Sequence, residues 1–192
     1  LIVLSGPSGV GKGTVREALF RQKSHDLLYS VSMTTRPPRE GEVHGREYFF
    51  ISPEEFRERI KNNKFLEYAE FVGNMYGTPA DIVEKHLQEG KEVVLEIDVQ
   101  GALQVKAKMP DAVFIFIAPP SFQALKNRLL QRGTEDDENI QKRLAKARRE
   151  LDFAPAYDYI VVNDEVNNAA DRIMAIIRAE HAKCSRSLEG YF

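Results

Sequence analysis

The chain has 192 residues, of which 43% are hydrophobic and 29% charged, the composition of an ordinary globular domain. Its 27 lysines and arginines nearly balance its 29 aspartates and glutamates, which argues against a protein that coats nucleic acid or an acidic membrane. The single cysteine, Cys184, excludes an internal disulfide and is typical of a reducing cytoplasm. No apolar run approaches the ~18 residues that a membrane-spanning helix needs. We therefore expect a cytoplasmic protein with neither a membrane nor a nucleic acid as partner.

Continuous apolar runs predict strands at residues 1–5, 93–97, 113–118 and 159–162. The chain begins directly in the first of these runs, without the charged region and cleavage site of a secretory signal, and we expect natural residues to precede it. Helical patterns follow at 14–21, from just after Pro79 to 90, at 121–132, from just after 139 to about 151, and from 166 to about 187. Because the strand runs do not alternate with polar residues, they indicate strands buried on both faces, as in a parallel α/β sheet.

The middle of the chain has a different pattern. Short, partly alternating and aromatic-rich segments at 28–33, 48–51 and 65–71 are separated by a polar loop at 34–45 and a short helix. That helix has Ser52 as its cap, Pro53 in its first turn and Glu55 completing a capping box. We expect an inserted subdomain over 32–82, with its own small antiparallel or mixed sheet. An acidic segment without apolar residues, 134–139, lies between two helices and is typical of a mobile lid.

A glycine-rich segment lies between the first strand and the first helix, and consists of Gly6, Pro7, Ser8, Gly9, Val10, Gly11, Lys12, Gly13 and Thr14. Glycines let several backbone N–H groups point inward around a phosphate, and the helix N-terminus adds its positive end. The usual pattern is G-x-x-x-x-G-K-[ST], with the last hydroxyl on Mg²⁺. Here Gly13 follows Lys12 and the hydroxyl comes one place later, at Thr14, which weakens the assignment of that hydroxyl to the metal.

Acidic residues end the second apolar strand, at Glu96 and Asp98. Ligands of open α/β sheets bind at the carboxyl ends of the strands, and a carboxylate there can hold Mg²⁺ through water. A further anion site is indicated on the 34–45 loop, where Arg36 and Arg39 precede Tyr48. Arginine binds phosphate with two parallel hydrogen bonds. For that loop alone, a solvated segment with incidental charges is an equally good explanation.

At this point the sequence resembles the guanylate kinases, and the bacterial members most. The resemblance is carried in order by residues 6–14, 32–39, 41–42, Tyr48, 65–67, 73–78, 96–101, 116–121, 132–134 and 162–164. It implies an α/β fold: a phosphate-loop NTPase core with a parallel sheet flanked by helices, an inserted small mixed-sheet GMP-binding subdomain, and a helical lid. The implied boundaries are 1–31, 83–122 and 145–192 for the core, 32–82 for the GMP-binding subdomain and 123–144 for the lid.

The resemblance also implies the activity, transfer of the γ-phosphoryl group of ATP to GMP in purine nucleotide metabolism, giving ADP and GDP. The implied catalytic residues are Lys12, Arg36, Arg132 and Arg143. ATP would contact the loop 6–14, Arg128, Arg132 and Asn163. GMP would contact Ser32, Arg36, Arg39, Tyr48, Glu67, Tyr76, Thr78 and Asp98. Mg²⁺ would be held mainly by nucleotide phosphates and water, with Thr14 and Glu96 as further candidates.

The chemistry of the base supports this interpretation independently. Guanine presents N1–H and N2–H₂ on one edge, so the single carboxylate of Glu67 can accept from both, while Ser32 can donate to O6. Adenine has a lone pair at N1, which a carboxylate repels, and this argues against the alternative of a kinase for another monophosphate such as AMP. The other alternative is a non-catalytic guanylate-kinase-like module that binds proteins. Such modules have lost the phosphate loop, whereas this chain keeps Lys12 and the glycines.

Overall fold

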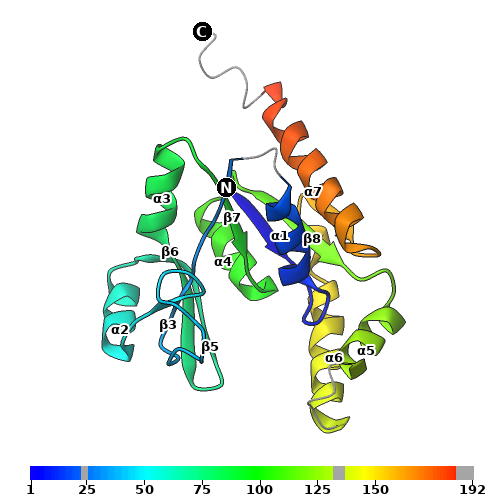
Figure 1. Ribbon diagram of the computed structural model, residues 1–192, viewed down its shortest axis with the longest axis horizontal. Coiled ribbons are helices and arrows are strands. Elements are labelled where there is room, and N and C mark those ends of the chain that lie inside the picture. The colour runs from blue at the N-terminus through cyan, green and yellow to red at the C-terminus, as the bar shows by residue number, and fades with distance from the viewer. Residues whose placement is uncertain (23–25, 132–136, 185–192) are drawn as a thin grey trace. The chain divides into compact units, whose positions relative to one another are not determined.

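The computed structural model describes residues 1–22, 26–131 and 137–184, and within them shows a mixed α/β protein (Figure 1). A five-stranded sheet has the order β2-β7-β1-β8-β9, and a four-stranded sheet has the order β4-β3-β6-β5. The strands are β1 (Ile2–Ser5), β2 (Leu27–Tyr29), β3 (Met33–Thr34), β4 (Phe49–Phe50), β5 (Phe65–Phe71), β6 (Asn74–Pro79), β7 (Glu92–Glu96), β8 (Val113–Ala118) and β9 (Tyr159–Val162). The helices are α1 (Lys12–Arg21), α2 (Pro53–Lys61), α3 (Ala80–Gln88), α4 (Val99–Lys108), α5 (Phe122–Gln131), α6 (Asp137–Leu151) and α7 (Val166–His181).

The larger sheet confirms the strands that were predicted from continuous apolar runs. Pairing is parallel between β1 and β8, between β8 and β9, and between β2 and β7. All six residues of β8 and all four of β1 are buried, as expected for strands covered on both faces. The predicted fold class, a parallel sheet flanked by helices with a separate small mixed sheet, is confirmed.

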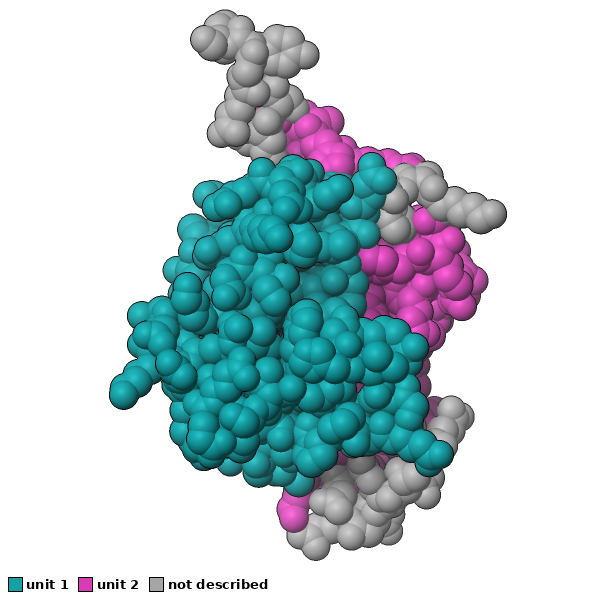
Figure 2. All heavy atoms as spheres, turned by 60° about the vertical axis from the view of Figure 1, so that its left-hand side comes forward, with its two compact units in different colours: residues 1, 26–95, 100–112 teal, residues 2–25, 96–99, 113–192 magenta. Residues whose placement is uncertain are grey.

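The chain forms two compact units (Figure 2). The first contains residues 26–95 and 100–112 together with Leu1, and the second contains 2–25, 96–99 and 113–192. Their limits differ from the predicted subdomain boundaries, which stay a prediction. None of the helices in the described ranges is both long and apolar enough to cross a membrane.

The first unit carries the small sheet and its own apolar core. Strand β3 pairs parallel with β4 and antiparallel with β6, and β5 pairs antiparallel with β6, so the sheet is mixed, as predicted. Its core consists of Met33, Phe56 and Phe65, and the last two rings stack with centroids 4.4 Å apart. Phe56 comes from α2, whose predicted cap is confirmed, since the Ser52 hydroxyl accepts from the Glu55 N–H at 3.1 Å.

Two elements of the first unit were not predicted from the sequence. Strand β6 contains Gly77 and Pro79, residues that normally argue against a strand interior. It joins β5 through a two-residue hairpin loop in which Val72 and Gly73 have φ of 49° and 71°. A Cβ added to Gly73 would meet nothing within 4 Å, so only its backbone conformation favours glycine. Helix α4 was likewise not predicted.

One predicted strand, 28–33, is wrong as a single element. The structure divides it into β2, which pairs with β7 in the larger sheet, and β3, which belongs to the small sheet. The apolar pattern continues through the division, because Val31 lies between the two strands, and a periodicity in sequence does not reveal that the chain changes sheets there.

The second unit places helices around β1, β8 and β9. Helices α1 and α7 lie side by side (Figure 1), and α7 buries Ala169, Ile173 and Ile177 at helical spacing, as predicted. Helices α5 and α6 pack together through an apolar cluster formed by Leu125, Leu129, Ile140, Leu144 and Ala147. The carboxyl-terminal part of α6 is thereby fixed within this unit.

We predict that the aromatic stack is the main source of stability for the small sheet. Phe56→Ala removes a fully buried ring and should lower the free energy of unfolding by about 3–5 kcal/mol. Phe71→Ala is the matched control, because that side chain is 65% exposed on the same sheet and its loss should cost within about 0.5 kcal/mol. Denaturant unfolding of both variants measures the difference, and equal losses would contradict this assignment.

Candidate functional site

The glycine-rich segment 6–14, the predicted phosphate loop, follows β1, and its first residue lies directly against a neighbouring strand. Gly6 has a φ of 150°, and a Cβ at this position would lie 2.2 Å from the carbonyl oxygen of Ile117 in β8. No side chain fits there. The loop ends at Gly11, which caps α1 in a left-handed conformation. The loop thus combines a sterically fixed start with a helix N-terminus, the geometry that presents backbone N–H groups to an anion.

Lys12 directs its ammonium group back into the loop. Its Nζ donates to the carbonyl oxygens of Gly6 at 2.7 Å and Pro7 at 3.3 Å. Desolvation lowers the pKa of Lys12 below the ordinary lysine value of 10.5, while the negative charges of Glu96, Glu150 and Asp98 act in the opposite direction. The candidate transfer residue is therefore a desolvated cation among carboxylates.

Glu96 ends β7 beside the loop. Its Oε2 pairs with Nε of Arg16 at 3.1 Å, and its Oε1 lies 3.6 Å from the position of a Cβ on Gly13. Burial raises the pKa of Glu96, although Arg16 and Lys12 favour its charged form. The other candidate for Mg²⁺, Thr14, is exposed. Among the described residues, no group of three or more acidic, histidine or cysteine side chains could hold a metal by itself.

Two predicted ATP-site residues brace the loop through its backbone. Arg128 donates from Nη1 to the carbonyl oxygen of Val10 at 3.0 Å and from Nη2 to that of Asn163 at 2.8 Å. The Asn163 side chain donates to the same Val10 oxygen at 2.8 Å. Arg128 and Asn163 therefore both hold the loop backbone at Val10.

Helix α6 contacts the loop at Ser8. Arg143 donates from Nη2 to the Ser8 hydroxyl at 3.2 Å, and the Ser8 N–H donates to Oε2 of Glu150 at 3.0 Å. The roles of Glu150 and of Arg16, the partner of Glu96, were not identified from the sequence. Arg132, the remaining predicted lid arginine, lies outside the described residues.

The first unit holds the predicted acceptor-phosphate residues around Arg36. Its guanidinium lies over the rings of Tyr48 and Phe50, at 5.6 and 5.8 Å from their centroids, and the Tyr48 ring meets that of Tyr76 edge-on at 6.0 Å. A guanidinium over aromatic rings, with the hydroxyl groups of Tyr48 and Tyr76 nearby, is typical of an anion site.

Glu42 orders this loop, although its sequence position gave no indication of a role beyond the resemblance. Nη2 of Arg36 donates to both of its carboxylate oxygens at 2.9 Å, and the N–H of Arg39 donates to Oε2 at 2.8 Å. The hydrogen bond raises the pKa of Arg36 and lowers that of Glu42. Arg36 is therefore held in one orientation and stays charged.

The predicted base-reading residues meet across two strands of the small sheet. Glu67 and Thr78 are directly paired in the register of β5 and β6, and both are buried. The Thr78 hydroxyl donates to Oε1 of Glu67 at 2.6 Å, which orients the carboxylate. Ser32 is half-buried just before β3. Asp98 belongs to the second unit, where its charge acts on Lys12.

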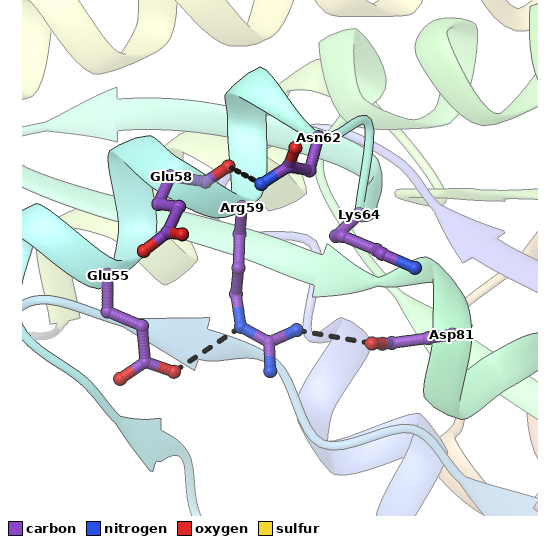
Figure 3. A pocket seen from close by; sticks show the side chains of 6 residues that line it. All are labelled: Glu55, Glu58, Arg59, Asn62, Lys64 and Asp81. Carbon is purple, nitrogen blue, oxygen red and sulfur yellow. Dashed lines mark hydrogen bonds and ion pairs between the residues drawn. The ribbon is translucent and has the colours of Figure 1, made fainter.

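A separate pocket of about 460 Å³ in the first unit is lined by Glu55, Glu58, Arg59, Asn62, Lys64 and Asp81 (Figure 3). Arg59 crosses it, with Nε 3.4 Å from Glu55 and Nη1 3.3 Å from Asp81. None of the predicted site residues lines this pocket. Its central cation is already paired, so we assign it no part in nucleotide binding.

Comparison with known proteins supports the same assignment over the full length. The family model described as guanylate kinase matches residues 1–180. The chain is 59% identical to a guanylate kinase of Bacillus anthracis and 57% to one of Bacillus subtilis (strain 168), each alignment covering all of this chain and 93% and 94% of the relative. The crystal structure of guanylate kinase from Anaplasma phagocytophilum superimposes with a TM-score of 0.76 at 37% identity, covering 97% of this chain and 88% of that one. The chain therefore belongs to the guanylate kinase family.

Proposed function

We propose that this protein transfers the γ-phosphoryl group of ATP to GMP, giving ADP and GDP. The observation that carries the proposal is the buried Glu67–Thr78 pair, in a chain that also keeps Lys12 and the glycines of the phosphate loop. Full-length relatives at 57–59% identity support it. The alternatives of another acceptor base and of a non-catalytic module have no support in these observations.

On the donor side, the loop 6–14 would bind the ATP phosphates through its N–H groups. Lys12 would exchange the carbonyl oxygens of Gly6 and Pro7 for phosphate oxygens and stabilise the charge that develops during transfer. Arg143 already reaches the loop at Ser8, and Arg128 and Asn163 would maintain its shape. We further propose a lid over 123–144 that brings Arg132 to the phosphates and excludes water.

Mg²⁺ is the cofactor that we propose for this reaction. Bound to the nucleotide, it would neutralise phosphate charge. The Thr14 hydroxyl and, through water, the Glu96 carboxylate are the residues that would hold it.

On the acceptor side, Arg36, Arg39, Tyr48 and Tyr76 would hold the GMP phosphate. Glu67, which Thr78 orients, would accept from guanine N1–H and N2–H₂, because an ionised carboxylate has two acceptor oxygens. Ser32 and Asp98 would complete the contacts to the base. We also place the protein in the cytoplasm, in purine nucleotide metabolism, with a GMP-binding subdomain over 32–82.

We predict that ADP forms rapidly with ATP and GMP, and far more slowly with AMP, UMP or dTMP as acceptor. A site built for a base's hydrogen-bond donors rejects an analogue lacking them by up to ~10⁴-fold, because buried polar groups are left unpaired. A coupled assay of ADP formation with the four monophosphates measures the ratios. No turnover with any acceptor would exclude a kinase, and a preference for AMP would exclude the assigned base.

The Lys12 prediction concerns both rate and pH. Lys12→Ala should lower kcat by orders of magnitude without unfolding the protein, because the side chain acts on charge in the transition state. Since its pKa lies below 10.5, Lys12 loses its proton at a lower pH than an ordinary lysine. As the pH is raised, kcat/KM for ATP should therefore begin to fall below pH 10.5. Lys12→Arg, whose cation does not titrate in this range, should remove that alkaline fall from the remaining activity. A profile that is identical in the two proteins would assign the fall to another group.

The Glu67 prediction isolates recognition of the base. Glu67→Gln removes the charge and presents only one amide oxygen, so kcat/KM for GMP should fall and the GMP/AMP ratio should narrow. IMP, which lacks N2–H₂, should be intermediate with the unaltered protein. Glu70→Gln is the matched control, because this neighbour on β5 is exposed. An unchanged ratio in Glu67→Gln would mean that Glu67 has a structural role only.

A further inference from the structure

An acidic side chain occupies an unfavourable place beside the phosphate loop. Glu150 is 5% exposed, and burying a carboxylate is costly unless it is paired. It lies one residue before the end of α6, where the helix dipole disfavours negative charge. It also lies beside a loop whose task is to bind a polyanion. Helix stability and anion binding would each favour a different residue, so another interaction accounts for it.

The contacts of Glu150 supply that interaction. Its Oε2 accepts from the Ser8 N–H at 3.0 Å, and its Oε1 lies 3.6 Å from Nζ of Lys146, one helical turn earlier. Arg143, two turns before Glu150 on the same face of α6, holds the Ser8 hydroxyl at 3.2 Å. Ser8 is thus bound at its backbone and its side chain by one helix face.

From this geometry we infer that Glu150 is a positioning residue for phosphoryl transfer: its carboxylate fixes the phosphate loop to α6 through the Ser8 N–H. The inference rests on the proposed function, because it concerns the same ATP site.

Glu150→Gln tests the proposal, because glutamine keeps the size and an acceptor oxygen but removes the charge. We expect kcat/KM for ATP to fall roughly 10-fold, since a hydrogen bond to a charged group becomes a neutral one, and KM for GMP to stay within about twofold. Glu150→Ala should lower kcat/KM roughly 10- to 100-fold, and Glu150→Asp should recover part of the loss.

Asp152→Asn is the matched control, because it removes the same charge two residues later from an exposed side chain, and should leave all these values unchanged. Calorimetry measures ATP binding without the acceptor, and so tests the loop separately from turnover. If the protein phosphorylates no monophosphate, the proposed function fails. Weaker ATP binding by Glu150→Gln would still support the positioning role in that case. Tighter ATP binding by that variant would mean that the carboxylate competes with phosphate, and overturns the proposal. Equal losses of kcat/KM for ATP and for GMP also overturn it.

Discussion

The phosphate loop depends on one interaction, the bonds from the Lys12 ammonium to the carbonyl oxygens of Gly6 and Pro7. They close the loop around its own cation. Burial of this charge lowers stability at neutral pH. Between the lowered pKa and 10.5 the unfolded chain binds more protons than the folded protein, so stability rises with pH in that window. Lys12, the proposed phosphoryl-transfer residue, thus lowers the stability of the folded protein at neutral pH.

A related arrangement, a cation beside an acidic side chain, occurs in both compact units. Glu42 orients Arg36, Glu96 pairs with Arg16, and the carboxylates near Lys12 keep its environment close to neutral. Pre-oriented cations lose less conformational entropy when they bind a phosphate. The near-zero net charge of the chain therefore says little about its binding sites, because each site is balanced locally.

Sequence patterns predicted the elements with strong local signals. The buried strands, the Ser52 cap and the glycine loop each follow from a few neighbouring residues. The division of 28–33 between two sheets depends on tertiary pairing, and β6 carries Gly77 and Pro79, which oppose a strand locally. For the candidate site, the motif residues could be named, but Glu150 could not. Its partner Ser8 is 142 residues away in the chain, and no local pattern indicates such a contact.

The two glycines at positions 6 and 73 differ in how far evolution can change them. At Gly73 the surrounding space is empty, so asparagine or aspartate, which tolerate a left-handed backbone, can replace it at small cost. At Gly6 the Ile117 oxygen fills the position of any Cβ, so every substitution must displace strand β8. Substitutions are therefore tolerated at Gly73 in the hairpin loop and excluded at Gly6. The reason is steric, and it is independent of what the loop at Gly6 binds.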